Sequence, residues 1–99
     1  MKITSLTTDQ LDKASSMLKA IAHPVRIAIL DLLEDGHKLS VSELHELLNI
    51  EQSTASHHLG IMKDKGILVS KREGKKIFYF IKDKNFNKII ECVGSCACL

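Results

Sequence analysis

Two short amphipathic helical patterns, 41–48 and 52–65, are separated by only three residues, and this arrangement constrains the fold more than any other feature. In the first pattern, valine and leucine recur at intervals of three and four residues. In the second, Ala55, Leu59 and Met62 recur in the same way, so each segment has one apolar face to bury. Two helices joined so closely must pack against each other, which predicts a helix-turn-helix unit.

Three further helical patterns surround this unit. One begins at a capping box formed by Thr7 and Gln10, and it is expected to end near Ala22. The next begins at Pro24, which suits a first helical position, and it is apolar nearly all round, so we place it at the centre of the core. The last covers about 85–93, and the small residues after it are expected to fray.

Two strand patterns, 67–72 and 76–81, follow the helix-turn-helix unit and are joined by a turn that contains Gly74. A two-stranded hairpin is marginal alone, so it must pack on the helices. The order of elements is then four helices, two strands and a fifth helix. It predicts a winged helix-turn-helix, a mainly α fold with a small β-hairpin, as a single domain over residues 1–99.

Basic residues are concentrated in one half of a chain whose formal net charge is only +2. The segment 52–84 carries eight basic and three acidic residues, so the remainder is net acidic. This local excess of positive charge indicates a binding surface for a polyanion such as DNA. No apolar run resembles a signal peptide or is long enough to span a bilayer, so a cytoplasmic protein without a membrane partner is expected.

The polar face of the segment 52–65 is the candidate DNA-reading surface. Its members off the apolar stripe are Ser53, Thr54, Ser56, His57 and Lys63. Hydroxyl, imidazole and ammonium groups suit base edges and phosphates in a DNA groove. The alternative is an ordinary amphipathic surface helix with a solvated face. The basic residues of the following hairpin favour DNA binding.

Three segments, taken in order, carry a family resemblance. The segment 18–30 contains Ala-His-Pro-Val-Arg-Ile-Ala-Ile-Leu, 52–59 reads Gln-Ser-Thr-Ala-Ser-His-His-Leu, and 69–79 contains Arg-Glu-Gly before a strand. With these segments the chain resembles the ArsR/SmtB family of bacterial metal-responsive repressors, which are small dimeric winged-helix proteins. The resemblance spans nearly the whole chain.

This resemblance implies a set of DNA contacts. The residues that would face the major groove are Gln52, Ser53, Thr54, Ser56 and His57. Those that would meet phosphate or the adjacent minor groove are Lys63 and the wing residues Arg72, Lys75 and Lys76. Each one has a plainer alternative, because a hydroxyl at a helix start can bind backbone amides and surface lysines can be merely solubilising.

The chain departs from the family pattern at Glu51, where the family often has serine. Serine is a better helix cap than glutamate, and an acid at this edge would face DNA phosphates unfavourably. We expect Glu51 to soften DNA affinity or to alter the sequence preference. His58, in the same segment, is expected to pack rather than to read bases.

The resemblance also implies a homodimer formed by the first and last helices. Its two recognition helices would read an inverted-repeat operator, with half-sites about one helical turn apart. The residues expected at the dimer interface are Leu11, Ala14, Leu18, Phe86, Ile89 and Ile90.

The effector sites of the family are less well preserved. The family's thiolate site lies in a Leu-Cys-Val-Cys segment, where this chain has Ser40 and Ser42 in place of the cysteines. Serine hydroxyls are poor substitutes for soft thiolates. A second family site uses carboxylates and histidine on the last helix, and there the chain offers only Glu91. Both sites therefore look absent.

All three cysteines lie close together near the C-terminus, at Cys92, Cys96 and Cys98. Three thiolates suit arsenic(III) or antimony(III), and with a fourth ligand they suit zinc or cadmium, so a metal or metalloid effector is one prediction. A redox or sulfide switch that forms a disulfide or polysulfide bridge is the second interpretation, and inert thiols are the third.

Two other classes of function remain to be weighed against a DNA-binding repressor. A winged helix can serve as a protein-interaction module without effector sensing, although the basic hairpin argues against this. An enzyme is unsupported, because the sequence shows no nucleophile–base pair, no glycine-rich phosphate loop and no paired carboxylates.

Overall fold

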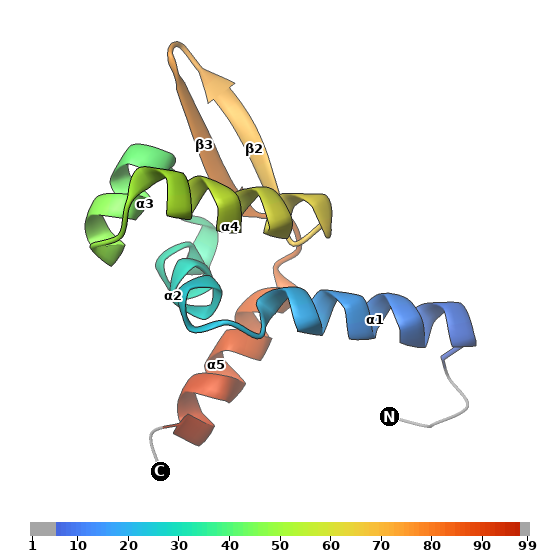
Figure 1. The fold of residues 1–99 in the computed structure, drawn as a ribbon. Coiled ribbons are helices and arrows are strands. Elements are labelled where there is room, and N and C mark those ends of the chain that lie inside the picture. Colours follow the sequence, from blue (N-terminus) through green and yellow to red (C-terminus); the bar gives the residue numbers. More distant parts are fainter. Residues whose placement is uncertain (1–5, 98–99) are drawn as a thin grey trace.

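The computed structural model describes residues 6–97 as five helices, one 3₁₀ turn and a three-stranded antiparallel sheet (Figure 1). In chain order the elements are α1 (Thr8–Ile21), α2 (Pro24–Leu32), the 3₁₀ turn (Glu34–Gly36), β1 (Leu39–Ser40), α3 (Val41–Leu48), α4 (Gln52–Asp64), β2 (Leu68–Glu73), β3 (Lys76–Ile81) and α5 (Asn85–Ala97). The predicted winged helix-turn-helix is confirmed, with β1 as an additional strand.

The core is built around α2, as its all-round apolar pattern predicted. Ile29 and Leu33 are completely buried, and α2 is contacted by α1, α3, α4 and α5. In Figure 1, α2 lies below α4, between it and α5. The largest fully buried side chains are Ile29, Leu30, Leu33, Leu44, Leu59, Met62, Ile67 and Leu68. The central helix therefore fixes the positions of the helices that pack on it.

Two predicted capping boxes are present and set where α1 and α3 begin. Thr7 accepts a hydrogen bond from the amide of Gln10 at 3.2 Å, and the Gln10 side chain accepts one from the Thr7 amide at 2.9 Å. The Ser40 hydroxyl and the Glu43 carboxylate exchange the same bonds, both at 3.2 Å. Each box satisfies amides that the first turn of a helix would otherwise leave unpaired.

The turn between α3 and α4 is stabilised by backbone geometry and by a histidine. Asn49 adopts a left-handed conformation with φ 54° and ψ 46°, which asparagine tolerates better than most residues. The amide of Ile50 then donates to the carbonyl of His45 at 3.1 Å, and the His45 Nδ1 lies 3.2 Å from the carbonyl of Ile50. These contacts reverse the chain so that α4 starts next to α3.

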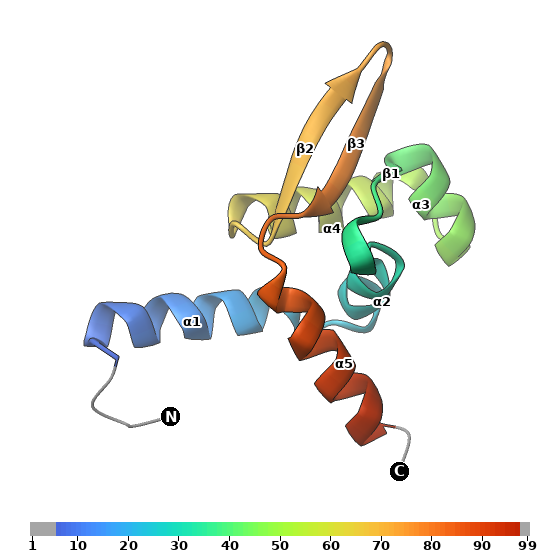
Figure 2. The ribbon, with the colours of Figure 1, turned by 180° about the vertical axis from the view of Figure 1, so that it is seen from behind.

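The sheet has the strand order β1-β3-β2, and all pairs are antiparallel. Glu73 pairs with Lys76, so Gly74 and Lys75 form a two-residue turn in which Gly74 has φ 63°. The hairpin of β2 and β3 projects away from the helices as the wing (Figures 1 and 2). On its inner side, Ser40 of β1 pairs with Phe78.

Two expectations for this fold were wrong. The strand β1 was not predicted, because two residues are too few to show an alternating pattern and their pairing partner lies in β3. The last helix was expected to end near Val93, but α5 continues to Ala97. Gly94 lowers helix propensity without ending a helix, and its φ is not positive.

No helix among residues 6–97 has both the length and the apolar character that a membrane span requires.

The Ser40 capping box gives a direct test of how α3 is held. Ser40→Ala is expected to lower the free energy of unfolding by about 1 kcal/mol, because the amide of Glu43 loses its side-chain acceptor. Urea denaturation followed by circular dichroism measures the loss. Ser42→Ala, at an exposed position of the same helix, is the matched control and should leave stability nearly unchanged. Equal losses in the two variants would contradict the capping role.

Candidate nucleic-acid interface

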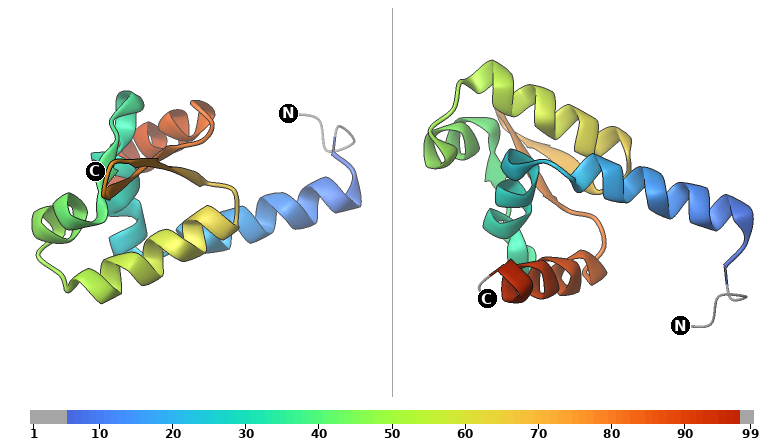
Figure 3. Two further views of the ribbon diagram at one scale, coloured as in Figure 1. Left: turned by 90° about the horizontal axis from the view of Figure 1, so that it is seen from above. Right: turned by 60° about the horizontal axis from the view of Figure 1, so that its bottom comes forward.

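Helix α4 divides into a buried face and an exposed polar face. Ala55, His58, Leu59 and Met62 are buried. The five residues predicted to face a DNA groove are all exposed, and these are Gln52, Ser53, Thr54, Ser56 and His57. Both views in Figure 3 place α4 along an edge of the molecule, with its outer side uncovered. The predicted division of this helix is therefore confirmed, and its polar face is free to contact a ligand.

Lys63 is exposed in the last turn of α4, at the opposite end of the helix from Gln52. An α-helix rises 1.5 Å per residue, so the two residues lie about 16 Å apart along the axis. They cannot contact the same base pair. This separation suits a helix whose first turns meet base edges while its last turn meets the phosphate backbone.

The wing carries positive charge at its tip. Arg72, Lys75 and Lys76 are all exposed, and the Arg72 Nε donates a hydrogen bond to the carbonyl of Gly74 at 3.3 Å. Because this bond uses only one of its donors, the Arg72 guanidinium retains further donors for a phosphate.

Glu73 is the acid nearest this tip, and Lys38 neutralises it. The Lys38 Nζ donates to the Glu73 Oε1 at 2.7 Å, and it also lies 5.9 Å from the centre of the Phe78 ring. The hydrogen bond from Lys38 is the main reason that the pKa of Glu73 is lowered, with the charges of Lys38 and Lys71 adding to it. The Lys38 ammonium therefore offsets the negative charge of Glu73 at the wing, and the pair links β2 to the chain before β1.

The wing and the start of α4 face a common hollow. Gln52, Lys75 and Lys76 line one open pocket of about 200 Å³ together with Ser42 and Ile77. Residues that are more than twenty positions apart in sequence are thus brought to one concave surface. An amide that suits base edges stands beside two ammonium groups that suit phosphate.

Comparison with known proteins agrees with this geometry. A family model described as a helix-turn-helix domain matches residues 21–71. The transcriptional regulator YgaV of Escherichia coli is 34% identical over 87 residues, which cover 88% of each chain.

Two solved structures are similar along nearly the whole chain. The transcriptional repressor PagR of Bacillus anthracis has a TM-score of 0.79 at 32% identity, covering 88% of this chain and 99% of its own. A homodimeric winged helix-turn-helix DNA-binding domain from Mycobacterium bovis, Mb0332, described as a possible ArsR-family regulator, has a TM-score of 0.82 at 26% identity, covering 98% and 89%. The chain belongs to the ArsR/SmtB family of winged-helix transcriptional regulators. The prediction that it is not an enzyme is confirmed, because its relatives are transcriptional regulators.

The surface expected to form an ArsR/SmtB-type dimer is only partly exposed. Leu11 and Leu18 on α1 are 51% and 57% exposed, and Ile89 on α5 is 37% exposed. Phe86 and Ile90 depart from the expectation, since each is only 8% exposed and belongs to the core of its own chain. The apolar stripe of α5 is wide enough for one side of it to pack on α2.

Between α1 and α5 the exposed part of this stripe forms a groove of about 280 Å³ without polar lining. Its lining residues are Ala14, Met17, Leu18, Ile21, Phe86 and Ile89. Phe86 thus belongs to the core and also lines the groove. Four of the six residues expected at a dimer interface line this one groove, and Leu11 continues its apolar surface along α1.

The C-terminal half of α5, which carries Cys92 and Cys96, lies on the far side of α2 from α4 (Figure 1). Cys92 and Cys96 are exposed free thiols on α5, one helical turn apart. Cys98 lies outside the described residues. Within residues 6–97, no three side chains of histidine, cysteine, aspartate or glutamate are grouped so that they could hold a metal ion. Ser40 caps α3, as its position in place of a family cysteine predicted.

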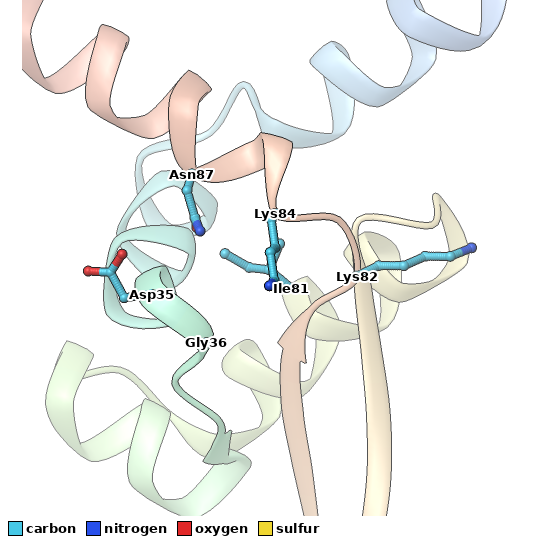
Figure 4. Close-up of a pocket in the computed structure, with 6 residues that line it drawn as sticks. All are labelled: Asp35, Gly36, Ile81, Lys82, Lys84 and Asn87. Carbon is cyan, nitrogen blue, oxygen red and sulfur yellow. The ribbon is translucent and has the colours of Figure 1, made fainter.

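A larger cavity of about 490 Å³ lies between the 3₁₀ turn, the end of β3 and the start of α5 (Figure 4). Asp35, Lys84 and Asn87 line it, and the Asn87 Oδ1 is buried there without a hydrogen-bond partner in the described structure. In Figure 4 the Lys82 side chain points away from Asp35. This lining offers no thiol and no imidazole, so it does not suit a thiophilic ion.

The sequence patterns did not reveal the role of Lys38. It lies outside every motif, and its partner Glu73 is 35 positions away. Lys38 and Glu73 meet because the sheet places β1 and β2 on either side of β3 and because their charges are opposite. Glu51, by contrast, occupies the N-cap of α4 without a side-chain capping bond, as expected of a poorer cap than serine, and its effect on DNA affinity stays a prediction.

The uncapped start of α4 can be tested at Glu51. Glu51→Ser is expected to raise the free energy of unfolding by about 1 kcal/mol relative to Glu51→Gln, because only serine places a short side-chain oxygen near the first amides of the helix. Both variants remove the acid, so their difference isolates capping. Thermal unfolding at one pH measures it. Equal midpoints would show that the helix start is satisfied in another way.

Proposed function

We propose that this protein is a homodimeric transcriptional repressor that binds an inverted-repeat operator through α4 and the wing. One observation carries the proposal most directly: Gln52 at the start of α4 and Lys75 and Lys76 of the wing line the same concave surface. A DNA duplex presents base edges and phosphates side by side, so it matches this combination of amide and ammonium groups.

The polar face of α4 would enter the major groove, which is wide enough for an α-helix. Ser56 and His57 lie on this face and would reach base edges or the groove wall. Arg72 at the wing would meet the neighbouring phosphates or minor groove. In this arrangement the basic residues supply affinity that depends on salt, while the polar residues of α4 supply sequence preference.

A second copy of the chain would cover the apolar groove between α1 and α5. The similarity to the homodimeric domain Mb0332 supports this, as does the exposure of Leu11, Leu18 and Ile89. A two-fold axis through this surface presents two α4 helices, and each reads one half-site. The operator is therefore expected to be an inverted repeat with half-sites about one helical turn apart.

The wing lysines test the DNA-binding proposal. Lys75→Ala with Lys76→Ala is expected to weaken binding to every DNA sequence and to reduce the slope of log K against log salt by about 1 to 2, because two phosphate contacts are lost. Fluorescence anisotropy with the DNA upstream of the protein's own reading frame, across a salt series, measures both effects.

The matched control is Lys84→Ala with Lys88→Ala, which removes two exposed cations near the start of α5. It should bind DNA with nearly the wild-type salt slope. If the two double variants share one salt slope, the wing does not contact phosphate. If the wild-type protein binds no DNA, the repressor proposal is refuted and a protein-interaction module is the remaining hypothesis.

Effector control would act from the C-terminal cysteines. Cys92 and Cys96 are exposed and one helical turn apart, which suits a thiophilic ion with Cys98 as a third ligand. Binding there would bias the α5 surface of the dimer, with a coupling of about 1–3 kcal/mol to DNA affinity. A disulfide or polysulfide among the same thiols is the alternative signal.

Titration of the reduced protein with arsenite, cadmium, zinc and copper(I) while DNA affinity is followed tests this control. An active effector is expected to weaken binding about 5- to 150-fold. A variant with serine at all three cysteine positions should bind DNA normally and should not respond. Oxidation with a polysulfide, measured in parallel, separates the redox alternative. If no ion and no oxidant changes affinity, sensing at these thiols is refuted while DNA binding stands.

A further inference from the structure

A hydrogen-bonded cluster joins the buried side of α4 to α1 and α2. His58 of α4 is only 7% exposed, and its Nδ1 accepts a hydrogen bond from the Arg26 Nε at 3.1 Å. The same guanidinium donates through Nη1 to the carbonyl of Ala20 at 3.1 Å. A single side chain of α2 thereby ties together the end of α1 and the middle of α4.

The chemistry of this bond fixes the protonation state of His58. A guanidinium has only donors, so Nδ1 must present its lone pair to Arg26. His58 is therefore neutral, with its proton on Nε2. An imidazolium carries protons on both nitrogens, so protonation would remove the acceptor and would place a second cation beside Arg26.

The surroundings of His58 also disfavour its protonated form. His23, the N-cap of α2, has its ring centre 4.6 Å from that of His58, and the ring of His57 on α4 lies at 5.8 Å. The element α1 contributes the Ala20 carbonyl, which Arg26 already occupies. Burial lowers the pKa of His58 most, and the charges of His23, Arg26 and His57 lower it further.

The bond also lies where it can set the rotation of α4 about its own axis. Successive residues of an α-helix are about 100° apart, so Ser56 points about 200° away from His58, nearly to the opposite side. His57 is the exposed neighbour of His58. Holding His58 at the back of the helix therefore fixes the direction in which the groove-facing residues point.

We propose that the Arg26–His58 hydrogen bond is a positioning element for DNA recognition, which holds α4 in its reading orientation only while His58 is neutral. The proposal rests on the proposed function, since it assigns a regulator to the same DNA-binding helix. Arg26 and His58 do not touch DNA in this arrangement. They act through the orientation of α4, and acidification opens the bond.

The direction of the pH effect follows from the neutral form that folding favours. The stabilisation of the folded chain by the Arg26–His58 bond is fully present above pH 6.5, the usual pKa of histidine. There His58 is neutral in folded and unfolded chains alike. It is lost as the pH falls through the lowered pKa of folded His58, which lies below that value. DNA affinity is therefore expected to decline on acidification through this bond.

His58→Asn separates positioning from mere packing. Asparagine places an amide oxygen near the position of Nδ1, so it still accepts from Arg26, but it does not titrate. This variant should bind operator DNA at pH 7.5 within about threefold of wild type. His58→Leu fills the space without an acceptor, and it should bind about tenfold more weakly, because the Arg26 donor is left unpaired.

Operator affinity of the three proteins is measured by fluorescence anisotropy from pH 5.5 to 8.0 at constant ionic strength. Effects of pH that the proteins share cancel in the difference between wild type and His58→Asn, so this difference is the quantity of interest. Wild type should lose affinity relative to His58→Asn as the pH falls through the lowered pKa of folded His58, below 6.5. Circular dichroism of each protein confirms that it is folded.

A second measurement does not depend on DNA. Long-range ¹⁵N–¹H correlation of the histidine rings at pH 7.5 should show His58 as the neutral tautomer with the proton on Nε2. A proton on Nδ1 would overturn the proposal whatever the DNA data show. If wild type binds DNA and its pH profile matches that of His58→Asn, the positioning role is refuted and the proposed function stands. If wild type binds no DNA at any pH, the proposed function itself fails.

Discussion

The burial of the inner face of α2 is the constraint on which the rest of the structure depends. Ile29 and Leu30 of α2, and Leu33 directly after it, leave almost no surface exposed, so other elements must cover this face of the helix. The helices α1, α3, α4 and α5 do so, and each exposes the face that it does not use for this packing. The polar face of α4 and the apolar groove between α1 and α5 are therefore two results of the same packing arrangement.

The local features of this fold could be predicted from sequence because their causes lie within a few residues of each other. The capping boxes at Thr7 and Ser40 need only a hydroxyl and a side chain three positions later, and the hairpin turn needs only a glycine at the right place. The contacts that escaped prediction are distant ones. Arg26 and His58 are 32 positions apart, and no periodicity of either segment pairs a guanidinium with one particular imidazole.

For the candidate site, exposure on α4 was predictable because an apolar stripe on one face determines the polar face opposite it. The dimer surface was less predictable from the sequence. The pattern of α5 identifies Phe86, Ile89 and Ile90 as one stripe, but only the packed chain shows that Phe86 and Ile90 are buried in the core of their own chain and that Ile89 is exposed. When the apolar stripe of a helix is wide enough to contact two neighbouring elements, the sequence pattern does not determine which element packs against which part of the stripe. The angle at which α5 crosses α2 decides this, and that angle is a tertiary property.

The dual role of Ser40 limits where the chain of this regulator can be divided to make chimeras. Ser40 is both the last residue of β1, paired with Phe78 of the wing, and the residue that caps α3. The helix-turn-helix and the wing thus share a residue, so neither can be exchanged without affecting the other. A chimera that exchanges only α3 and α4 separates the Ser40 cap from the helix that it caps. Boundaries placed at Leu39 and Ile81 keep the cap, the third strand and the recognition helix together, but an exchanged segment of this length still depends on Arg26 and Lys38 of the host chain as partners for His58 and Glu73.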